Sequence, residues 1–162
     1  MRKFNLLLLS LLLSFSVMAA PKKGAIVQVN LNPAGSFQIK AKIKGSLSKK
    51  GSMLTAKKLT ASVKSFKTGM DLRDEHTKKK LNYKKFPKIL VTDVKAKAGN
   101  GVAKITIMNK AQVVKFKYKD IDSKYATAKF QLSLKKFGIS GINYMGVGVE
   151  DIITVTATLK KK

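Results

Sequence analysis

Apolar and polar side chains alternate with a period of two along most of this sequence, and this alternation constrains the fold more than any other feature. The period is clearest in four segments, at residues 37–44, 59–64, 126–135 and 154–160. It is weaker in four more, at residues 25–31, 88–97, 102–108 and 112–118. Because successive side chains of a strand point to opposite faces of a sheet, the pattern predicts eight strands, each with one buried face.

Short, turn-like breaks separate these segments, for example Asn32–Gly35 and Gly99–Gly101. Short turns join antiparallel neighbours, and eight antiparallel strands with one apolar face close into a barrel or fold into a sandwich. For residues 88–97 the pattern leaves open which face is buried. One interval departs from the period: Asp71 to Leu81 has acids at its start and lysines at its end, which predicts a short helix.

Many of the predicted inward positions carry small side chains, and these leave volume unfilled inside a barrel. They are Ala41, Ala61, Ala126, Ala128 and Ala157. An eight-stranded barrel either fills itself with side chains or holds one small ligand, and an apolar cavity suits an apolar ligand better than water. The alternative is that the rings of Phe37, Phe116 and Phe130 cross the interior and fill it.

Composition excludes several classes of chemistry. The chain has no cysteine and one histidine, His76, so thiolate sites, disulfides and multi-histidine metal sites within one chain are absent. Lysine and arginine number 34 against 8 acids, and Arg73 is the one arginine after Arg2. Lysines are point charges on long stems, so this surface indicates diffuse attraction to anionic surfaces rather than sequence-specific nucleic-acid binding. The basic and aromatic strip at 115–119 is explained equally well by strand alternation.

The first residues predict a targeting segment. Arg2 and Lys3 precede a leucine-rich run, Asn5 to Met18, which is followed by the small residues Ala19 and Ala20. This pattern is typical of a cleavable signal peptide at 1–19, followed by one domain at 20–162. The run is short for a membrane anchor, which is the less favoured alternative. We therefore expect an exported protein, periplasmic in a bacterial envelope.

The stretch from Lys64 to His76, with Thr68-Gly69 before Arg73-Asp74-Glu75-His76, and the later pair Phe86-Pro87 resemble the YceI-like family of exported bacterial proteins. The segment Phe130–Ile139, followed by Met145-Gly146-Val147, is similar to that family's closing segment. The resemblance implies an all-β fold, an eight-stranded antiparallel lipocalin-like barrel with one short helix inserted. It also implies a binding protein rather than an enzyme, with no cofactor, whose lumen holds a polyisoprenoid or lipid such as a quinone. Further histidines that many members carry are missing here.

The resulting prediction is a periplasmic barrel that sequesters or carries an apolar isoprenoid-type ligand. The residues expected to bind it are Ile39, Ile43, Leu59, Val63, Arg73, His76, Phe116, Phe130, Leu132, Leu134, Tyr144 and Met145. Arg73 and His76 would orient a head group; the alternative is a structural role, with Arg73 paired to Glu150 or Asp151. Tyr144 and Met145 would gate the cavity or close one end of the barrel.

The competing function is a lysine-coated scaffold with a filled lumen that binds polyanions or anionic envelope surfaces. A membrane surface is also a candidate partner of the carrier, because lysines attract anionic lipid. No nucleophile is placed beside His76, and no specific nucleic-acid partner is expected. The oligomeric state stays open, a homodimer included.

Overall fold

A computed structural model describes residues 22–144 and 146–162; the predicted signal peptide, Met145 and the side chain of Tyr144 lie outside this part. Eight of its strands have six or more residues: β1 (Gly24–Asn32), β2 (Ser36–Ala41), β5 (Met53–Ser62), β6 (Lys88–Lys97), β7 (Asn100–Ile107), β8 (Lys110–Asp120), β9 (Tyr125–Ser133) and β12 (Ile152–Lys160). Each of the eight predicted segments falls largely within one of them, so the predicted strands are confirmed.

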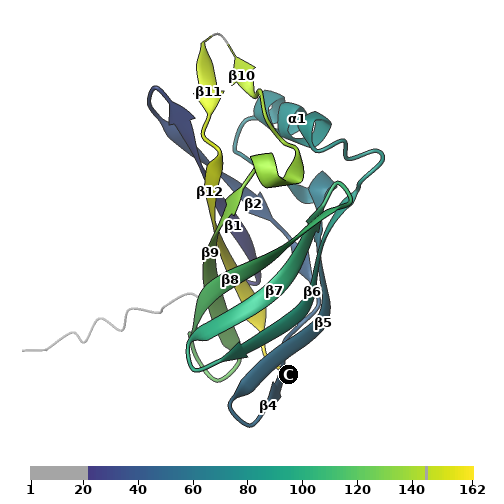
Figure 1. Ribbon diagram of the computed structural model, residues 1–162, viewed down its shortest axis with the longest axis vertical. Coiled ribbons are helices and arrows are strands. Elements are labelled where there is room, and N and C mark those ends of the chain that lie inside the picture. The colour runs from purple at the N-terminus through teal and green to yellow at the C-terminus, as the bar shows by residue number, and fades with distance from the viewer. Residues whose placement is uncertain (1–21, 145) are drawn as a thin grey trace, which may run out of the picture.

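Shorter elements complete the described chain. They are the strands β3 (Ile43–Lys44), β4 (Ser48–Lys50), β10 (Asn143–Tyr144) and β11 (Val147–Val149), the 3₁₀ turns η1 (Val63–Ser65) and η2 (Lys135–Phe137), and the helix α1 (Asp71–Lys80). Figure 1 shows α1, η2 and the β10–β11 hairpin at one end of an elongated barrel, with β4 and the C-terminus at the other.

The long strands form a nearly closed antiparallel barrel. From β1 the sheet runs through β12, β9, β8, β7 and β6 to β5. It closes because the predicted strand at 37–44 divides at Lys42: β2 pairs with β1, and β3 pairs with β5 through Ile43 and Ala61. A bridge between Lys40 and Lys67 adds to this seam. Closure at this seam covers the edges of β2 and β5, on which strands of other chains would otherwise pair.

A β-bulge in β6 explains why the buried face of this strand was ambiguous in the sequence. The register with β7 shifts between Thr92 and Lys95, and Asp93 has a φ of 54°. One extra residue reverses which side chains face inward. Ile89 and Val91 therefore face the interior before the bulge, and Val94 faces it after the bulge.

Helix α1 is anchored to the barrel by its one buried acid, Asp74, whose residue is 2% exposed. Asp74 Oδ1 accepts hydrogen bonds from the backbone N–H and the hydroxyl of Thr68, at 2.6 and 2.8 Å. Asp74 Oδ2 lies 3.0 Å from Lys67 Nζ. The helix covers one end of the barrel, and the predicted helix at 71–81 is confirmed.

Two apolar clusters divide the interior along its length. The larger one includes Val63, Phe137 and Ile153 and lies toward the helix end, in contact with Phe66 and Leu81. The smaller one lies at the opposite end and joins Leu47, Leu54, Leu59 and Leu159 to small alanines. Lys161 seals that end: its Nζ lies 2.8 Å from Asp120 Oδ1 and donates to the carbonyl of Asp122 at 2.8 Å. Ala126, expected to border free space, is instead packed in the smaller cluster.

Candidate functional site: an apolar cavity in the barrel

The interior of the barrel holds a cavity of about 700 Å³. Its wall is built by inward side chains of the long strands, including Val27, Ile39, Ile105, Leu132 and Val155. The predicted small residues Ala41, Ala61, Ala128 and Ala157 also line it. An alanine side chain reaches less far into the lumen than a valine or leucine would at the same position. These alanines therefore account for part of the space.

The phenylalanine rings expected to fill the lumen stand in its wall instead. Phe37, Phe116 and Phe130 all line the cavity and leave the space between them open. Each is only partly buried by the protein itself. The alternative in which these rings plug the barrel is therefore wrong.

Most of the polar side chains that line the cavity lie at one end. Among the residues that line it, the polar side chains are Thr60, Arg73, His76, Thr77 and Lys80, and four of these five belong to α1. We call this end, bordered by α1 and β11, the mouth. A wall with one polar end fits an elongated apolar molecule that carries a polar group at one terminus.

Three exposed apolar side chains surround the mouth. Met70 is 53% exposed, Leu72 57% and Val147 40%, and all three also line the cavity. Apolar side chains left in water at the entrance of an apolar cavity indicate contact with a ligand or an apolar surface.

The basic side chains at the mouth already have partners. The Arg73 guanidinium lies over the ring of Phe37, 4.5 Å from its centroid, and Arg73 Nη2 is 3.0 Å from Met70 Sδ. Lys80 Nζ donates to the carbonyl of Ser140 at 2.6 Å, which ties α1 to the loop after η2. These contacts hold both cations beside the cavity.

The alternative in which Arg73 pairs with Glu150 or Asp151 is wrong, because none of the salt bridges among the described residues involves Arg73. Asp151 instead accepts hydrogen bonds from the N–H of Lys135 and the hydroxyl of Ser133, each at 2.7 Å. These two hydrogen bonds lower the pKa of Asp151, and the bond from the N–H of Lys135 has the larger effect. Asp151 thus fixes the turn that follows β9, while Arg73 stays at the cavity.

The family model of the YceI-like domain matches residues 22–160 of this sequence. The chain belongs to the YceI-like family. The fold resembles that of a polyisoprenoid binding domain from Saccharophagus degradans implicated in plant cell wall breakdown, at 9% identity and a TM-score of 0.63, covering 85% of this chain and 92% of that one. It also resembles BcnA of Burkholderia cenocepacia, at 16% identity and a TM-score of 0.56, covering 85% and 96%. No curated protein matches the sequence significantly.

Most of the predicted binding residues meet at the cavity of this YceI-like barrel. Those that line it are Ile39, Ile43, Leu59, Arg73, His76, Phe116, Phe130, Leu132 and Leu134. Their role in binding stays a prediction, since lining a cavity is a matter of position. Met145 and the Tyr144 side chain lie outside the described residues.

Val63 is the residue that the structure removes from the predicted site. The sequence pattern continued the strand to residue 64, but β5 ends at Ser62 and Val63 begins η1. Its side chain is 1% exposed and packs in the larger core cluster, outside the cavity lining. The alternation of apolar and polar residues cannot show where a strand ends. Val63 follows the end of β5 directly and is apolar, so it fits the alternation although it is not part of the strand.

Several lining residues were missed because they come from irregular segments. Met70 and Leu72 flank the start of α1, and Ile139 and Ile142 follow η2. No strand or helix period marks such positions.

Within residues 22–144 and 146–162, no group of three or more His, Cys, Asp or Glu side chains could hold a metal ion. In the same part of the chain, no helix is both long and apolar enough to cross a bilayer.

Proposed function

We propose that this protein is a periplasmic carrier that holds the chain of an isoprenoid-type lipid, such as a quinone, inside the barrel. The observation that carries the proposal is the apolar cavity of about 700 Å³ with polar side chains gathered at one end. The family membership supports a binding role, and one structural neighbour is a polyisoprenoid binding domain. The carrier role requires no catalytic group.

Affinity comes from apolar surface that the lipid chain removes from water. Burial of one methylene group contributes about 0.8 kcal/mol, so a ligand with several prenyl units gains enough to offset the loss of its own freedom. Cavity-facing side chains such as Ile39, Leu132 and Val155 already shape the walls before binding. A preformed cavity reduces the free energy needed to order the protein around its ligand.

The ligand enters through the mouth while the barrel rests on a lipid surface. Met70, Leu72 and Val147 form an exposed apolar rim there, and Lys78 and Lys79 at the end of α1 supply positive charge. Apolar side chains enter the interfacial region of a bilayer, and lysines are attracted to anionic head groups. This arrangement passes a lipid from bilayer to lumen without exposing its chain to water.

The competing scaffold function needed a filled lumen, and the cavity counts against it. Salt distinguishes the remaining possibilities. Binding in the lumen persists at high ionic strength, whereas polyanion binding to surface lysines falls steeply.

Extraction of the natively purified protein tests the proposal directly. Organic extraction followed by mass spectrometry should recover a prenyl lipid in amounts close to one per protein. Its repeated absence, together with failure to bind added farnesol, would overturn the carrier function.

A substitution inside the lumen locates the bound chain. Leu132→Trp places a bulky side chain in the cavity, since Leu132 lines it from β9. We expect farnesol binding to fall at least about tenfold, because the indole occupies space that the ligand needs. Thr156→Trp is the matched control, because Thr156 lies on the neighbouring β12 between the cavity-lining Val155 and Ala157 and lines no part of the cavity. Equal binding by both variants would place the site elsewhere.

The membrane step is tested at the rim. Met70→Gln combined with Leu72→Gln should reduce co-sedimentation with phosphatidylglycerol vesicles and slow lipid uptake. The matched control is Met53→Gln with Ile121→Gln, which removes two apolar side chains of comparable exposure, 40% and 44%, away from the mouth. Equal losses in both variants would show that vesicle binding does not depend on the mouth.

A further inference from the structure

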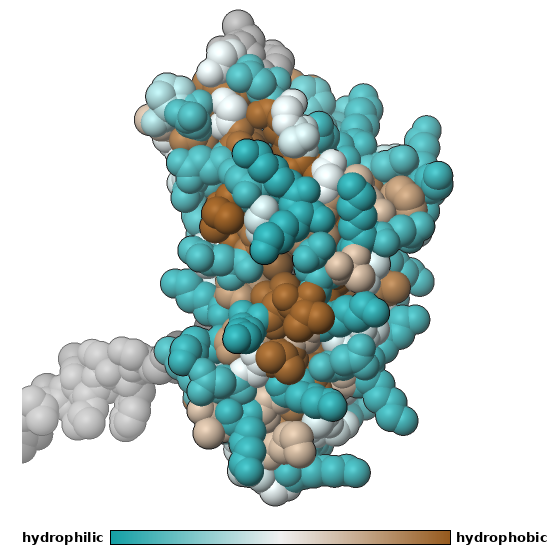
Figure 2. Space-filling model, viewed as in Figure 1, coloured by the Kyte–Doolittle hydropathy of each residue, from teal (hydrophilic) through white to brown (hydrophobic). Residues whose placement is uncertain are grey.

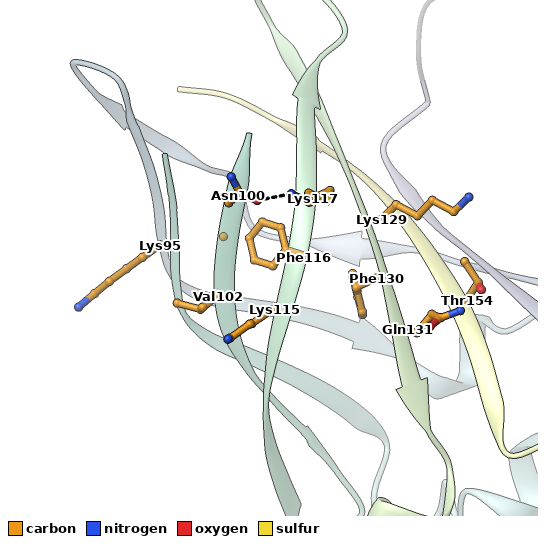
Figure 3. A pocket seen from close by; sticks show the side chains of 11 residues that line it. Lys95, Asn100, Val102, Lys115, Phe116, Lys117, Lys129, Phe130, Gln131 and Thr154 are labelled. Atoms are coloured by element: carbon orange, nitrogen blue, oxygen red, sulfur yellow. Dashed lines mark hydrogen bonds between the residues drawn. The ribbon is translucent and has the colours of Figure 1, made fainter. Parts of the chain in front are cut away.

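The barrel wall opens between β8 and β9. The two strands pair over only four rungs, from Lys117 opposite Lys129 to Asp120 opposite Ala126. Beyond the first of these rungs the strands diverge, and residues 110–116 of β8 have no partner in β9. The separation is visible in Figure 1 and, from close by, in Figure 3. The upper end of the gap is bordered by η2, where the carbonyl of Lys136 accepts a hydrogen bond from Gln112 at 3.3 Å.

A second cavity, of about 790 Å³, lies over this gap on the outer side of the sheet. Phe116 and Phe130 line both this outer cavity and the lumen. These two residues would form the next rung if the pairing of β8 with β9 continued. The two cavities therefore meet at a pair of partly buried aromatic side chains, with no ladder hydrogen bonds between them. Figure 2 shows an apolar patch in the middle of this face of the barrel, surrounded by hydrophilic side chains.

The outer cavity is cationic. Its eleven lining residues include the lysines Lys95, Lys115, Lys117 and Lys129 and no acid. In Figure 3, Lys115 and Lys117 reach toward β7, whereas the side chain of Lys129 extends from β9 away from the gap. Lys117 Nζ is held by Asn100 Oδ1 at 2.6 Å. Among the salt bridges of the described chain, none involves these four lysines.

The rung next to the gap, where Lys117 of β8 lies opposite Lys129 of β9, places two positive charges on neighbouring strands. Lys117 and Lys129 are direct partners across the strands, and like charges at such positions are destabilising. An anion bound between them removes this repulsion and gains two charge-assisted contacts. Lysine suits such a site because its flexible stem adapts to the position of a phosphate-type group.

The mouth is less suited to an anion than the gap. Its cations Arg73 and Lys80 are engaged with Phe37 and with the carbonyl of Ser140. Helix α1 also carries three acids, of which Asp71 is fully exposed. A neutral polar group is compatible with that mixture, whereas the outer cavity at the gap is lined by four lysines and no acid.

We propose that the gap between β8 and β9 is a lateral head-group site, and that the ligand is an isoprenoid phosphate whose chain lies in the lumen and whose phosphate sits between Lys117 and Lys129. The chain leaves the lumen between Phe116 and Phe130. This inference rests on the proposed lumen function, adds the charge of the head group, and places that group at the gap instead of at the polar end of the cavity.

Calorimetric titration with three probes tests the proposal: farnesyl phosphate, farnesol and inorganic phosphate. The site variant is Lys117→Gln with Lys129→Gln. The control variant, Lys49→Gln with Lys50→Gln, makes the same change of charge on exposed lysines of β4. We expect the site variant to bind farnesyl phosphate about tenfold more weakly than the wild type, with farnesol unchanged. The control variant should bind both as the wild type does.

The outcomes separate this inference from the lumen function. Equal affinity of the wild type for farnesol and farnesyl phosphate would overturn the head-group site and leave the carrier function standing. If the wild type binds neither farnesol nor farnesyl phosphate, the carrier function itself is overturned. Inorganic phosphate that binds as tightly as farnesyl phosphate, with the same dependence on the two lysines, would show a surface anion site unconnected to the lumen.

Chemical acetylation of lysines in the wild-type protein, measured by mass spectrometry, gives an independent check that needs no substitution. Farnesyl phosphate should protect Lys117 and Lys129 from acetylation several-fold, and farnesol should not. Protection of Lys80 at the mouth in place of these two would move the head group to the helix end and overturn the lateral site.

Discussion

Asp74 Oδ2 lies 3.0 Å from Lys67 Nζ, and the two side chains differ sharply in exposure, 4% for the acid and 63% for the base. Burial by itself raises the pKa of Asp74, but hydrogen bonds from the backbone and hydroxyl of Thr68, together with Lys67, outweigh it and lower the pKa to about 2. The same pair raises the pKa of Lys67. Asp74 therefore stays ionised beneath the helix that forms the mouth.

Replacement of Asp74 by asparagine should remove the part of the pH dependence of unfolding free energy that arises from titration of Asp74. Because the folded pKa of Asp74 lies below its usual 3.8, its contribution is complete above about pH 4 and is lost as the pH falls toward 2. Asp74→Asn should therefore cost roughly 1–3 kcal/mol at neutral pH, and its difference from the wild type should shrink between pH 4 and pH 2. Urea unfolding at a series of pH values measures both quantities.

The neighbouring acid of the same helix serves as the control for this prediction. Asp71 is 3.7 Å from Lys67 Nζ but fully exposed. Asp71→Asn should leave stability nearly unchanged at every pH, because water screens a fully exposed ion pair. A constant difference between Asp74→Asn and the wild type down to pH 2 would contradict the assignment.

The strands could be predicted because the barrel has one dry face and one wet face, which gives every long strand a period of two. The short strands β3, β4, β10 and β11 have two or three residues each, too few for any period to show. The bulge at Asp93 reversed the period within a single strand, and this is why the buried face of 88–97 stayed open. What alternation reports is the face of a residue, not where a strand ends or bends.

The site could be predicted only as far as it follows from the same alternation. Leu132 and Phe130 were found because inward residues of a hollow barrel necessarily line its lumen. The lateral gap could not be predicted, because the extent of pairing between β8 and β9 depends on the twist of both strands and not on their residue types. In the sequence, Lys117 and Lys129 occupy polar positions of alternating segments, which predict only a solvated strand face.

Lys161 should be worth more to stability than an ordinary surface lysine. The residue is 8% exposed, and its Nζ lies 2.8 Å from both Asp120 Oδ1 and the carbonyl of Asp122. Lys161→Ala leaves these acceptors without their cation in a partly buried position, which should cost about 1–3 kcal/mol. Lys162→Ala makes the same change of charge at the exposed last residue and should cost little. Equal thermal stability of the two variants would show that the buried ammonium does not secure the closed end.

The processing of the chain is predicted from residues outside the described structure. The leucine-rich run and the small residues before Ala20 predict cleavage after Ala19. Protein recovered from the periplasmic fraction of a bacterial host should therefore begin at Ala20, as measured by mass spectrometry of the intact chain. An intact Met1 in the membrane fraction would support the uncleaved anchor instead.

The contact between Gly101 and Phe116 should control the lateral gap. The two residues are partners across β7 and β8, and a Cβ added to Gly101 would collide with the ring of Phe116 and lie 2.9 Å from the Cβ of Ala96. Gly101→Ala should therefore displace the ring from its place beside the gap, at a cost of about 1–3 kcal/mol in unfolding free energy. Binding of farnesyl phosphate should weaken as well, because the displaced ring obstructs the path between lumen and gap.

A double-mutant cycle separates this effect from a general loss of stability. In Phe116→Ala the ring is gone, so adding Gly101→Ala to that variant should cost much less than it does in the wild type, with a coupling energy of about 1 kcal/mol or more. Gly148→Ala is the control, because an added Cβ there meets no atom closer than 3.8 Å and the backbone is not in the left-handed region. If the two substitutions change the free energy of unfolding additively, the position of the Phe116 ring does not depend on glycine at position 101. Another cause would then have to hold Phe116 and Phe130 beside the gap.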